Sequence, residues 1–397
     1  MKFIEDIFAK VRPNFEKGGK WEKFYYIYEA HETLLLAPNS TTGATGAQIR
    51  DAIDMKRMMM TVIIAMVPCL LFGIWNAGYQ HYLAIGEVAA LGDILLTGAI
   101  LVVPIIIVSY AVGLGIEFTF ATIRKHEVNE GFLVTGMLIP LVMPASIPLW
   151  QVGLATAFAV IIGKEVFGGT GMNILNVALT ARAFLYFAYP SQISGDVWSF
   201  IGEGNTAVAA FSGATPLAIG AAAVEGTEPM VSMLNNSWSE GLFDFWNMFI
   251  GIMPGSIGET STLMCLIGAA ILIFTGVGSW KIIFSVFAGA FAMGTLCNVF
   301  GANEYMLLPA HYHLVIGGLA FGAVFMASDP VTAAQTETGK WIYGFLIGIL
   351  TVIIRVFNPA YPEGIMLAIL LMNVFAPLID YYVVAANKKR RLKRATV

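Results

Sequence analysis

The chain has 397 residues, of which 57% are hydrophobic and only 12% are charged. A water-soluble domain carries about twice that charged fraction. The apolar residues come in long blocks almost free of charge, so the composition indicates a polytopic membrane protein. The net charge of −4 gives no indication of nucleic-acid binding. The three cysteines lie singly in apolar runs, which predicts neither a disulfide framework nor a complete iron–sulfur or zinc site.

Residues 1–56 are charged and amphipathic, and they lack the apolar core of a cleaved signal peptide. We therefore expect them to form a cytoplasmic N-terminal arm that precedes the membrane part of the chain.

Eight apolar runs approach the length of about 20 residues that a spanning helix needs. Two further runs are shorter or interrupted. One begins at Gly131 and contains three prolines, and the other begins at His313 and stops at Asp329. The eight uninterrupted runs are residues 58–78, 94–116, 149–164, 173–189, 260–278, 281–300, 341–357 and 363–385.

Counting both interrupted runs predicts ten crossings, and this count satisfies the positive-inside rule. The basic residues of the arm, of the connections and of the C-terminal sequence KKRRLKR then all lie on one side. No Lys or Arg occurs between Arg182 and Lys281, so this acidic connection is expected outside. Both termini are expected in the cytoplasm.

Each interrupted run is the third crossing of a group of five. Because five is odd, the two groups are predicted to have opposite topology, with a ligand site near the broken crossings. The predicted fold is an all-α membrane protein with repeats over 57–190 and 260–386, an external loop region over 191–259 and a basic tail over 387–397. The alternative is that Pro and Gly only kink two packed helices.

A glycine-rich turn lies between the fourth and fifth crossings, in "GKEVFGGTGMNILNVALTAR" from Gly163. Asn173 and Asn176 follow it three residues apart, so both amides are expected on the same side of the first turn of a helix. Paired amides suit the polar edge of a planar heterocycle. The alternative is an ordinary glycine turn before a capped helix.

Charged residues within apolar runs are costly and indicate function. Asp329 ends the second broken crossing, where backbone carbonyls can also contact a cation, so we predict it on a cation path. Glu117 and Asp380 fit either such a path or an internal ion pair. His311 and His313 lack nearby carboxylates apart from Glu304, and no metal site is predicted there.

The short stretch "FSGATPLAIG" from Phe211 contains a single threonine directly before a proline. Pro216 disfavours the helical conformation at Thr215, so we expect an extended residue with an accessible hydroxyl. From the pattern alone, a solvated turn is the alternative.

Several motifs resemble one known family: "SGATPLA", "KEVFGGTGMN", "HEVNEGFLVTG" and "FMASDPVTA". They are similar to the B subunit of the sodium-translocating NADH:quinone reductase and to its sister, the D subunit of the Rnf complex. The resemblance covers nearly the whole chain. The N-terminal arm, with "GGKWEKFYYIYEAHETLLLAP" and "RDAIDMKRMM", resembles the quinone-reductase branch and is lacking in the Rnf branch.

The resemblance implies two flavins, a quinone site and a sodium path. A dedicated flavin transferase would attach FMN to the hydroxyl of Thr215 as a phosphoester, and a non-covalent riboflavin would bind near the glycine turn. The residues that match the family's sites are Thr215, Ser212, Gly213 and Ala214 for FMN, Asn173, Asn176 and Gly169 for riboflavin, Gly113 and Leu114 for quinone, and Asp329, Glu117, Asp380 and Glu29 for sodium.

The implied function is that of one membrane subunit in a six-subunit, redox-driven Na⁺ pump of the bacterial inner membrane. Electrons would pass from FMN through riboflavin to quinone. Because the chain has no NADH-binding GxGxxG motif after a strand, other subunits would take the electrons from NADH. The alternative is a stand-alone secondary transporter or channel with the same inverted repeat and no redox role.

Overall fold

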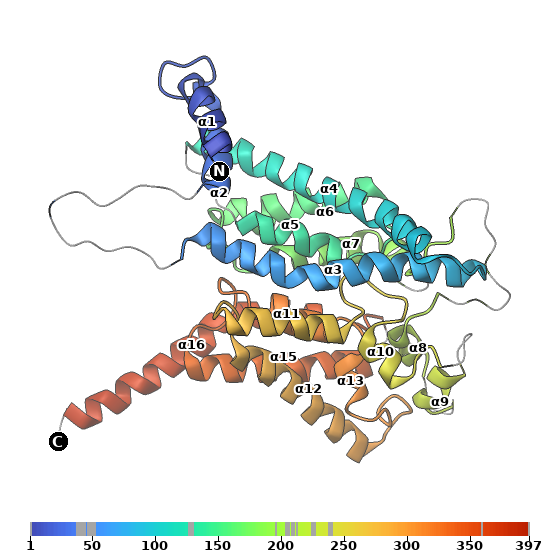
Figure 1. Ribbon diagram of the computed structural model, residues 1–397. Coiled ribbons are helices and arrows are strands. Elements are labelled where there is room, and N and C mark those ends of the chain that lie inside the picture. The colour runs from blue at the N-terminus through green and yellow to red at the C-terminus, as the bar shows by residue number, and fades with distance from the viewer. Residues whose placement is uncertain are drawn as a thin grey trace.

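The computed structural model describes residues 2–36, 45, 53–125, 131–194, 197–202, 207, 211, 213–223, 228–236, 241–358 and 360–395, with side chains from residue 4 onward. Throughout these residues the regular structure is helical. Two groups of helices lie side by side, one built from the first half of the chain and one from the second (Figure 1).

The first group follows two short helices of the N-terminal arm. Six helices of the described chain are long and apolar enough to cross a membrane, and three belong to this group. The arm and first group consist of α1 (Lys2–Val11), η1 (Arg12–Asn14), η2 (Glu22–Phe24), α2 (Tyr25–Leu35), α3 (Met55–Ile85), α4 (Leu91–Arg124), α5 (Gly131–Leu141), α6 (Leu149–Gly163), η3 (Glu165–Phe167), α7 (Val177–Ala188) and η4 (Pro190–Gln192).

Three short helices connect the two groups, and the second group supplies the other three long apolar helices. The connecting helices are α8 (Pro216–Ala222), α9 (Met230–Asn235) and α10 (Phe245–Ile250). The second group consists of α11 (Thr262–Phe274), α12 (Trp280–Phe300), α13 (Tyr312–Val315), α14 (Leu319–Phe321), the π-helix η5 (Gly322–Met326), α15 (Glu337–Phe357) and α16 (Ile365–Ala395).

The helix bundle has two distinct ends (Figure 1). The end that carries α1, α2 and the C-terminal part of α16 is here called the terminal face, and the end that carries α8, α9 and α10 is called the α8 face. The arm is tied to the first group, because the Tyr26 hydroxyl donates to the Lys125 carbonyl over 2.9 Å. Within the arm, burial raises the pKa of Tyr28 to about 12, so its phenol stays protonated and donates to the Phe8 carbonyl over 2.9 Å.

Glycines allow the helices to approach closely, as is usual where bilayer-embedded helices pack. A Cβ added at Gly348 of α15 would lie 2.2 Å from the Val286 carbonyl oxygen of α12. At the junction of the two groups, a Cβ at Gly268 of α11 would lie 2.5 Å from the Ala65 carbonyl oxygen of α3. Any larger residue at these positions would push the helices apart.

The first interrupted run forms α5, which ends at Leu141 and is followed by a segment without helix up to Leu149. Prolines in this run cannot donate backbone hydrogen bonds, so the helix cannot continue regularly. The freed carbonyls are used by the connection before α11. The Leu141 oxygen accepts from the Gly258 amide at 2.7 Å, and the Met143 oxygen accepts from the Ile257 amide at 3.0 Å.

The second interrupted run is divided into α13, α14 and η5. Gly317 has a φ of +64°, a conformation that L side chains rarely adopt, and it marks the break between α13 and α14. The fully buried Arg355 of α15 donates to the carbonyls of His313 at 2.7 Å and Ile316 at 2.8 Å. An arginine from a neighbouring helix thereby supplies the hydrogen bonds that the break removes.

Several expected helix ends were wrong. The helix expected at 173–189 begins only at Val177, because positive-φ glycines occupy the preceding turn and Asn176 caps the helix. The helix expected at 260–278 spans Thr262–Phe274, between the Ser261 cap and a turn at Gly276. The helix expected at 94–116 extends over Leu91–Arg124. The last helix continues to Ala395, so the described part of the basic tail extends α16.

Candidate functional site

The structure contains a cleft at the α8 face, which we call the α8 cleft. It encloses about 670 Å³, including the part open to solvent. Six separate chain segments contribute to it: α7, the segment after η4, the start of α8, the connection before α11, the break between α13 and α14 and the connection between α15 and α16. The residues used below are Arg182, Trp198, Thr215, Ser256, Glu259, Thr260, Gly318 and Glu363.

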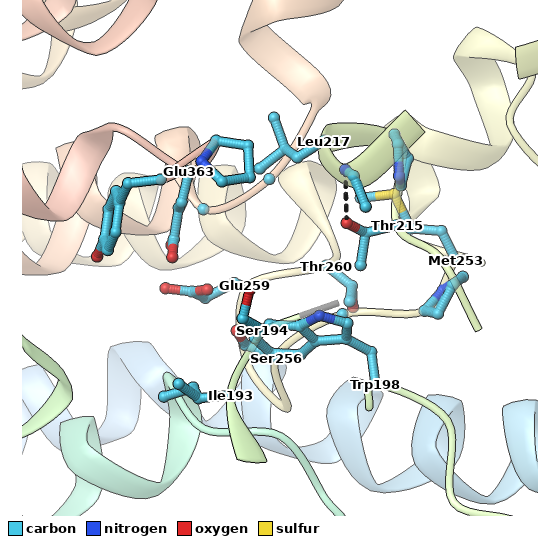
Figure 2. Close-up of a pocket in the computed structure, with 18 of the residues that line it drawn as sticks. Ile193, Ser194, Trp198, Thr215, Leu217, Met253, Ser256, Glu259, Thr260 and Glu363 are labelled. Carbon is cyan, nitrogen blue, oxygen red and sulfur yellow. Dashed lines mark hydrogen bonds between the residues drawn. The ribbon is translucent and has the colours of Figure 1, made fainter. Parts of the chain in front are cut away.

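Thr215 lies at the wall of the α8 cleft, directly before α8 (Figure 2). Its φ of −83° and ψ of 161° are extended, which confirms the conformation expected before Pro216. Its half-buried side chain caps α8, and the Oγ1 atom accepts from the Ala218 amide at 3.2 Å. Gly213 is buried and Ala214 is half-buried, whereas Ser212 lies outside the described residues.

Arg182 binds the two acidic side chains that line the α8 cleft. Its guanidinium donates to Glu259 Oε2 at 2.9 Å and to Ser256 Oγ at 3.3 Å, and it also pairs with Glu363. Its Cζ atom lies 5.8 Å from the centre of the Trp198 ring. Because an arginine beside two carboxylates stays charged, this cluster is a buried ion triad rather than an isolated cation.

A second cleft opens at the terminal face, and we call it the terminal cleft. It encloses about 860 Å³ of space, part of it open to solvent. It lies at the junction of the two groups, because α3, α5 and the loop before α7 contribute on one side and η5 with the following loop on the other. The residues used below are Gly131, Lys164, Thr170, Asn173, Asn176 and Asp329.

The two asparagines line the terminal cleft but occupy different positions. Asn176 is the N-cap of α7, and its Oδ1 atom accepts from the Leu179 amide at 3.2 Å. Asn173 lies before the helix, and its amide donates to the Leu175 carbonyl at 3.0 Å. The expectation that both amides lie in the first helical turn was therefore wrong. The fold nevertheless brings both into one cleft.

The glycine turn before Asn173 requires glycine, because Gly168, Gly169 and Gly171 have φ values of +121°, +96° and +88°. Thr170, within this turn, lines the terminal cleft, and its buried Oγ1 atom has no hydrogen-bond partner among the described residues. A buried hydroxyl without a partner is unfavourable by about 1–3 kcal/mol, which a polar ligand in the cleft would offset.

The acidic residues expected on the sodium path lie in four different places. Asp329 lines the terminal cleft and accepts from the Val331 amide and the Thr332 hydroxyl, both at 3.0 Å. Asp380 instead holds the start of α15, since it accepts from the Gln335 amide at 2.7 Å and the Thr336 hydroxyl at 2.6 Å.

The other two acids lie outside the linings of both clefts. Glu117 forms a buried ion pair with Lys164, which supports the alternative interpretation of this residue. Glu29 lies in the arm, where it accepts from the Thr33 hydroxyl at 3.1 Å.

The two residues matched to the quinone site lie in α4. Gly113 is buried, and a Cβ there would lie 1.8 Å from the Phe132 ring of α5, so glycine permits this packing. Leu114 is half-buried. Neither residue belongs to the lining of the α8 cleft or the terminal cleft.

Comparison with known protein families shows to which family the chain belongs. A model of the NQR2, RnfD, RnfE family matches residues 42–389. The chain belongs to this family. Among its relatives, proteins named as the B subunit of Na(+)-translocating NADH-quinone reductase from Ectopseudomonas mendocina and Stutzerimonas stutzeri are each 49% identical to it, covering 98% of this chain and 99% of theirs. The protein of the same name from Azotobacter vinelandii is 48% identical with the same coverage.

For this member of the NQR2, RnfD, RnfE family, the sequence did not single out Glu363 or Trp198. Glu363 was the first residue of the crossing expected at 363–385, and charged residues are common at the ends of membrane-spanning helices. Its ion pair with Arg182 joins residues 181 positions apart, and no local pattern predicts such a contact. Glu259 belongs to the acidic connection between Arg182 and Lys281, and no local pattern distinguishes it from the other acids there.

Proposed function

We propose that this chain is the membrane subunit of a redox-driven sodium pump, a Na⁺-translocating NADH-quinone reductase. The support is the near-complete coverage by relatives of that name at 46–49% identity. The long apolar helices suit a subunit embedded in a membrane. In this proposal electrons pass from a flavin in the α8 cleft, through a flavin in the terminal cleft, to quinone, and this transfer drives Na⁺ export.

The α8 cleft is the proposed site of covalent FMN, attached through its phosphate to the Thr215 hydroxyl. One observation carries this proposal: the family motif's threonine is extended, half-buried and part of the wall of a cleft. Trp198 offers a flat apolar surface in the same cleft. FMN would supply the capacity to carry one or two electrons, while the chain holds and orients it.

The terminal cleft is the proposed riboflavin site. The amides of Asn173 and Asn176 offer both donors and acceptors to the polar edge of an isoalloxazine ring. The unpartnered hydroxyl of Thr170 offers a further polar contact, and the turn that positions it includes the buried, positive-φ Gly169. These residues therefore fit a neutral flavin.

The remaining assignments are proposals that rest on the family resemblance. Quinone would bind near Gly113 and Leu114, and Na⁺ would pass Asp329 on its route through the subunit. Glu29, Glu117 and Asp380 remain proposed sodium-path residues, although their contacts are those of local structure.

We further propose ten crossings in two inverted repeats, over residues 57–190 and 260–386. The six long helices supply six crossings, and α5, α7, α11 and the run from α13 to η5 supply four. The 191–259 connection would lie outside, and the arm and the tail would lie in the cytoplasm. The chain would function in the bacterial inner membrane with five other subunits, after a flavin transferase has attached FMN.

The alternative of a stand-alone transporter or channel does not hold. Relatives that match over nearly their full length are named as subunits of a reductase, and none of the proteins compared above carries a transporter name.

The covalent flavin provides the direct test. We expect wild-type protein, separated on a denaturing gel, to fluoresce under ultraviolet light, and Thr215→Ala to lose that fluorescence completely. Thr260→Ala is the matched control, because Thr260 lines the same cleft and its hydroxyl accepts a long hydrogen bond of 3.4 Å from the Asn76 amide. It should retain the flavin. A Thr215→Ala band that still fluoresces would rule out the attachment site.

A further inference from the structure

Two acidic side chains face each other in the α8 cleft, opposite Thr215. Figure 2 shows the side chain of Glu363 pointing toward that of Glu259, with Thr215 on the other side of the cleft. Glu259 comes from the connection before α11, and Glu363 comes from the connection between α15 and α16. Arg182, from α7 of the first group, pairs with both. The cluster therefore lies where the two helix groups meet.

Each carboxylate uses only one of its oxygens. Arg182 binds Oε2 of Glu259 and Oε2 of Glu363. The Oε1 atoms of both residues are buried and have no hydrogen-bond partner among the described residues. Glu259 is only 4% exposed, so water reaches its carboxylate poorly. Two buried carboxylates whose side chains point toward each other repel unless a cation or a shared proton lies between them.

Arg355 lies near the two carboxylates but donates no hydrogen bond to their Oε1 atoms. Arg355 directs its guanidinium to the backbone carbonyls of His313, Ile316 and Glu363. Neither carboxylate receives a hydrogen bond from it in the structure, although its charge lowers the cost of burying them. The two Oε1 atoms therefore receive no hydrogen bond from either arginine.

The position of Glu259 depends on a glycine. A Cβ at Gly318 would lie 2.8 Å from both the carboxyl carbon and Oε1 of Glu259. The backbone at Gly318 has an ordinary negative φ of −81°, so the backbone conformation itself does not require glycine. The glycine is needed because the carboxylate packs against the chain at this point, next to the break between α13 and α14.

Two hydroxyl groups lie in the same cleft as the two carboxylates. The buried hydroxyls of Ser256 and Thr260 line the same cleft. Carboxylate and hydroxyl oxygens are hard ligands, which suit hard cations rather than soft transition metals. The guanidinium of Arg182 pairs with both carboxylates, and the charge of Arg355 also lies close to them. The cluster therefore has little excess negative charge, which favours a weakly bound monovalent cation over a tightly bound divalent one.

We infer that Glu259 and Glu363 form a binding site for Na⁺ in the α8 cleft. The inference rests on the proposed function, and it assigns the external end of the sodium path to residues that the sequence comparison did not suggest. Weak binding suits a site from which the ion must leave. In the proposed function, the phosphate of FMN on Thr215 adds negative charge to the same cleft. This charge increases the attraction of a cation to the two carboxylates.

The test uses the complete reductase complex, purified with wild-type chain, Glu259→Gln or Glu363→Gln. Glutamine keeps the size of the side chain and removes its charge. We expect each variant to raise the Na⁺ concentration for half-maximal quinone reduction by roughly tenfold, equivalent to about 1.4 kcal/mol of cation binding. Equilibrium binding of radioactive Na⁺ to the oxidised complex should weaken by the same factor. Gly318→Ala, which displaces the Glu259 carboxylate without removing it, should act in the same direction.

Glu337→Gln is the matched control, because this glutamate is 65% exposed at the start of α15 and pairs with Lys281 and Lys340. Its Na⁺ dependence should equal that of wild type. Unchanged Na⁺ dependence and binding in Glu259→Gln, Glu363→Gln and Gly318→Ala would overturn the inference. A shifted pH profile with unchanged Na⁺ binding would also overturn it, because the pair would then share only a proton. Absence of covalent flavin from the wild-type chain would contradict the proposed function instead, and Na⁺ binding would still test the site.

Discussion

Asn176 combines a structural contact with a proposed ligand contact. Its Oδ1 atom caps α7, and the residue also lines the terminal cleft. Replacing an asparagine N-cap by alanine costs about 0.5–2 kcal/mol, whereas serine caps nearly as well. The two roles can therefore be separated by the choice of substitution.

We expect Asn176→Ser to lose riboflavin while α7 stays intact. Serine retains a capping oxygen but cannot offer the amide to a flavin, and the loss of one buried polar contact should weaken binding roughly tenfold. Acid extraction of the purified complex releases the non-covalent flavin and measures it, while the covalent FMN in the same sample is the internal control. Full riboflavin content in Asn176→Ser would remove this residue from the site.

At the scale of the helix, the two interrupted runs share a physical problem. Each break frees backbone carbonyls that lie among packed apolar helices, where water is scarce. The connection before α11 supplies amides to the first break, and Arg355 supplies a guanidinium to the second. Both donors come from segments distant in the sequence, so neither break is stabilised by its own helix.

We expect Arg355→Met to destabilise the second break by about 3 kcal/mol or more, because carbonyls of His313 and Ile316 lose their donors. Arg355→Lys should have an intermediate effect, since lysine keeps the charge without the planar fork. The thermal unfolding midpoint of the purified complex measures both. Arg391→Met, in the exposed tail, is the control that should match wild type. An unchanged midpoint in Arg355→Met would mean that other groups satisfy these carbonyls.

For the whole molecule, the proposed topology places the α8 face outside and the terminal face in the cytoplasm. The three native cysteines are buried and should react slowly with a bulky reagent. Cysteines introduced at exposed Ala222 of α8 and exposed Lys389 of α16 therefore report on the two faces.

A membrane-impermeant maleimide applied to intact spheroplasts should label Ala222→Cys and leave Lys389→Cys unlabelled. In inverted membrane vesicles the result should reverse. Labelling of both positions from the same side would contradict opposite locations of the α8 face and the tail, and with them the proposed ten crossings.

The local sequence was sufficient for some features. Pro216 predicted the extended Thr215, and the prolines after Gly131 predicted an interrupted helix, since both effects act on the residue itself or its neighbours. The start of α7 was predicted too early. The positive-φ glycines and the cap at Asn176 delay the helix, and both depend on how the preceding turn folds, which the local sequence does not show.

The sequence by itself determined the membrane class, the places where two apolar runs are interrupted and the family to which the chain belongs. The tertiary structure decided which charges meet. Glu117 pairs with Lys164 across 47 positions, and Arg182 joins Glu259 across 77. A charge that is removed from water must find a partner, and that partner is chosen by how helices pack rather than by the residues adjacent in the chain. The facing carboxylates of Glu259 and Glu363 therefore became visible only when the two groups of helices were assembled.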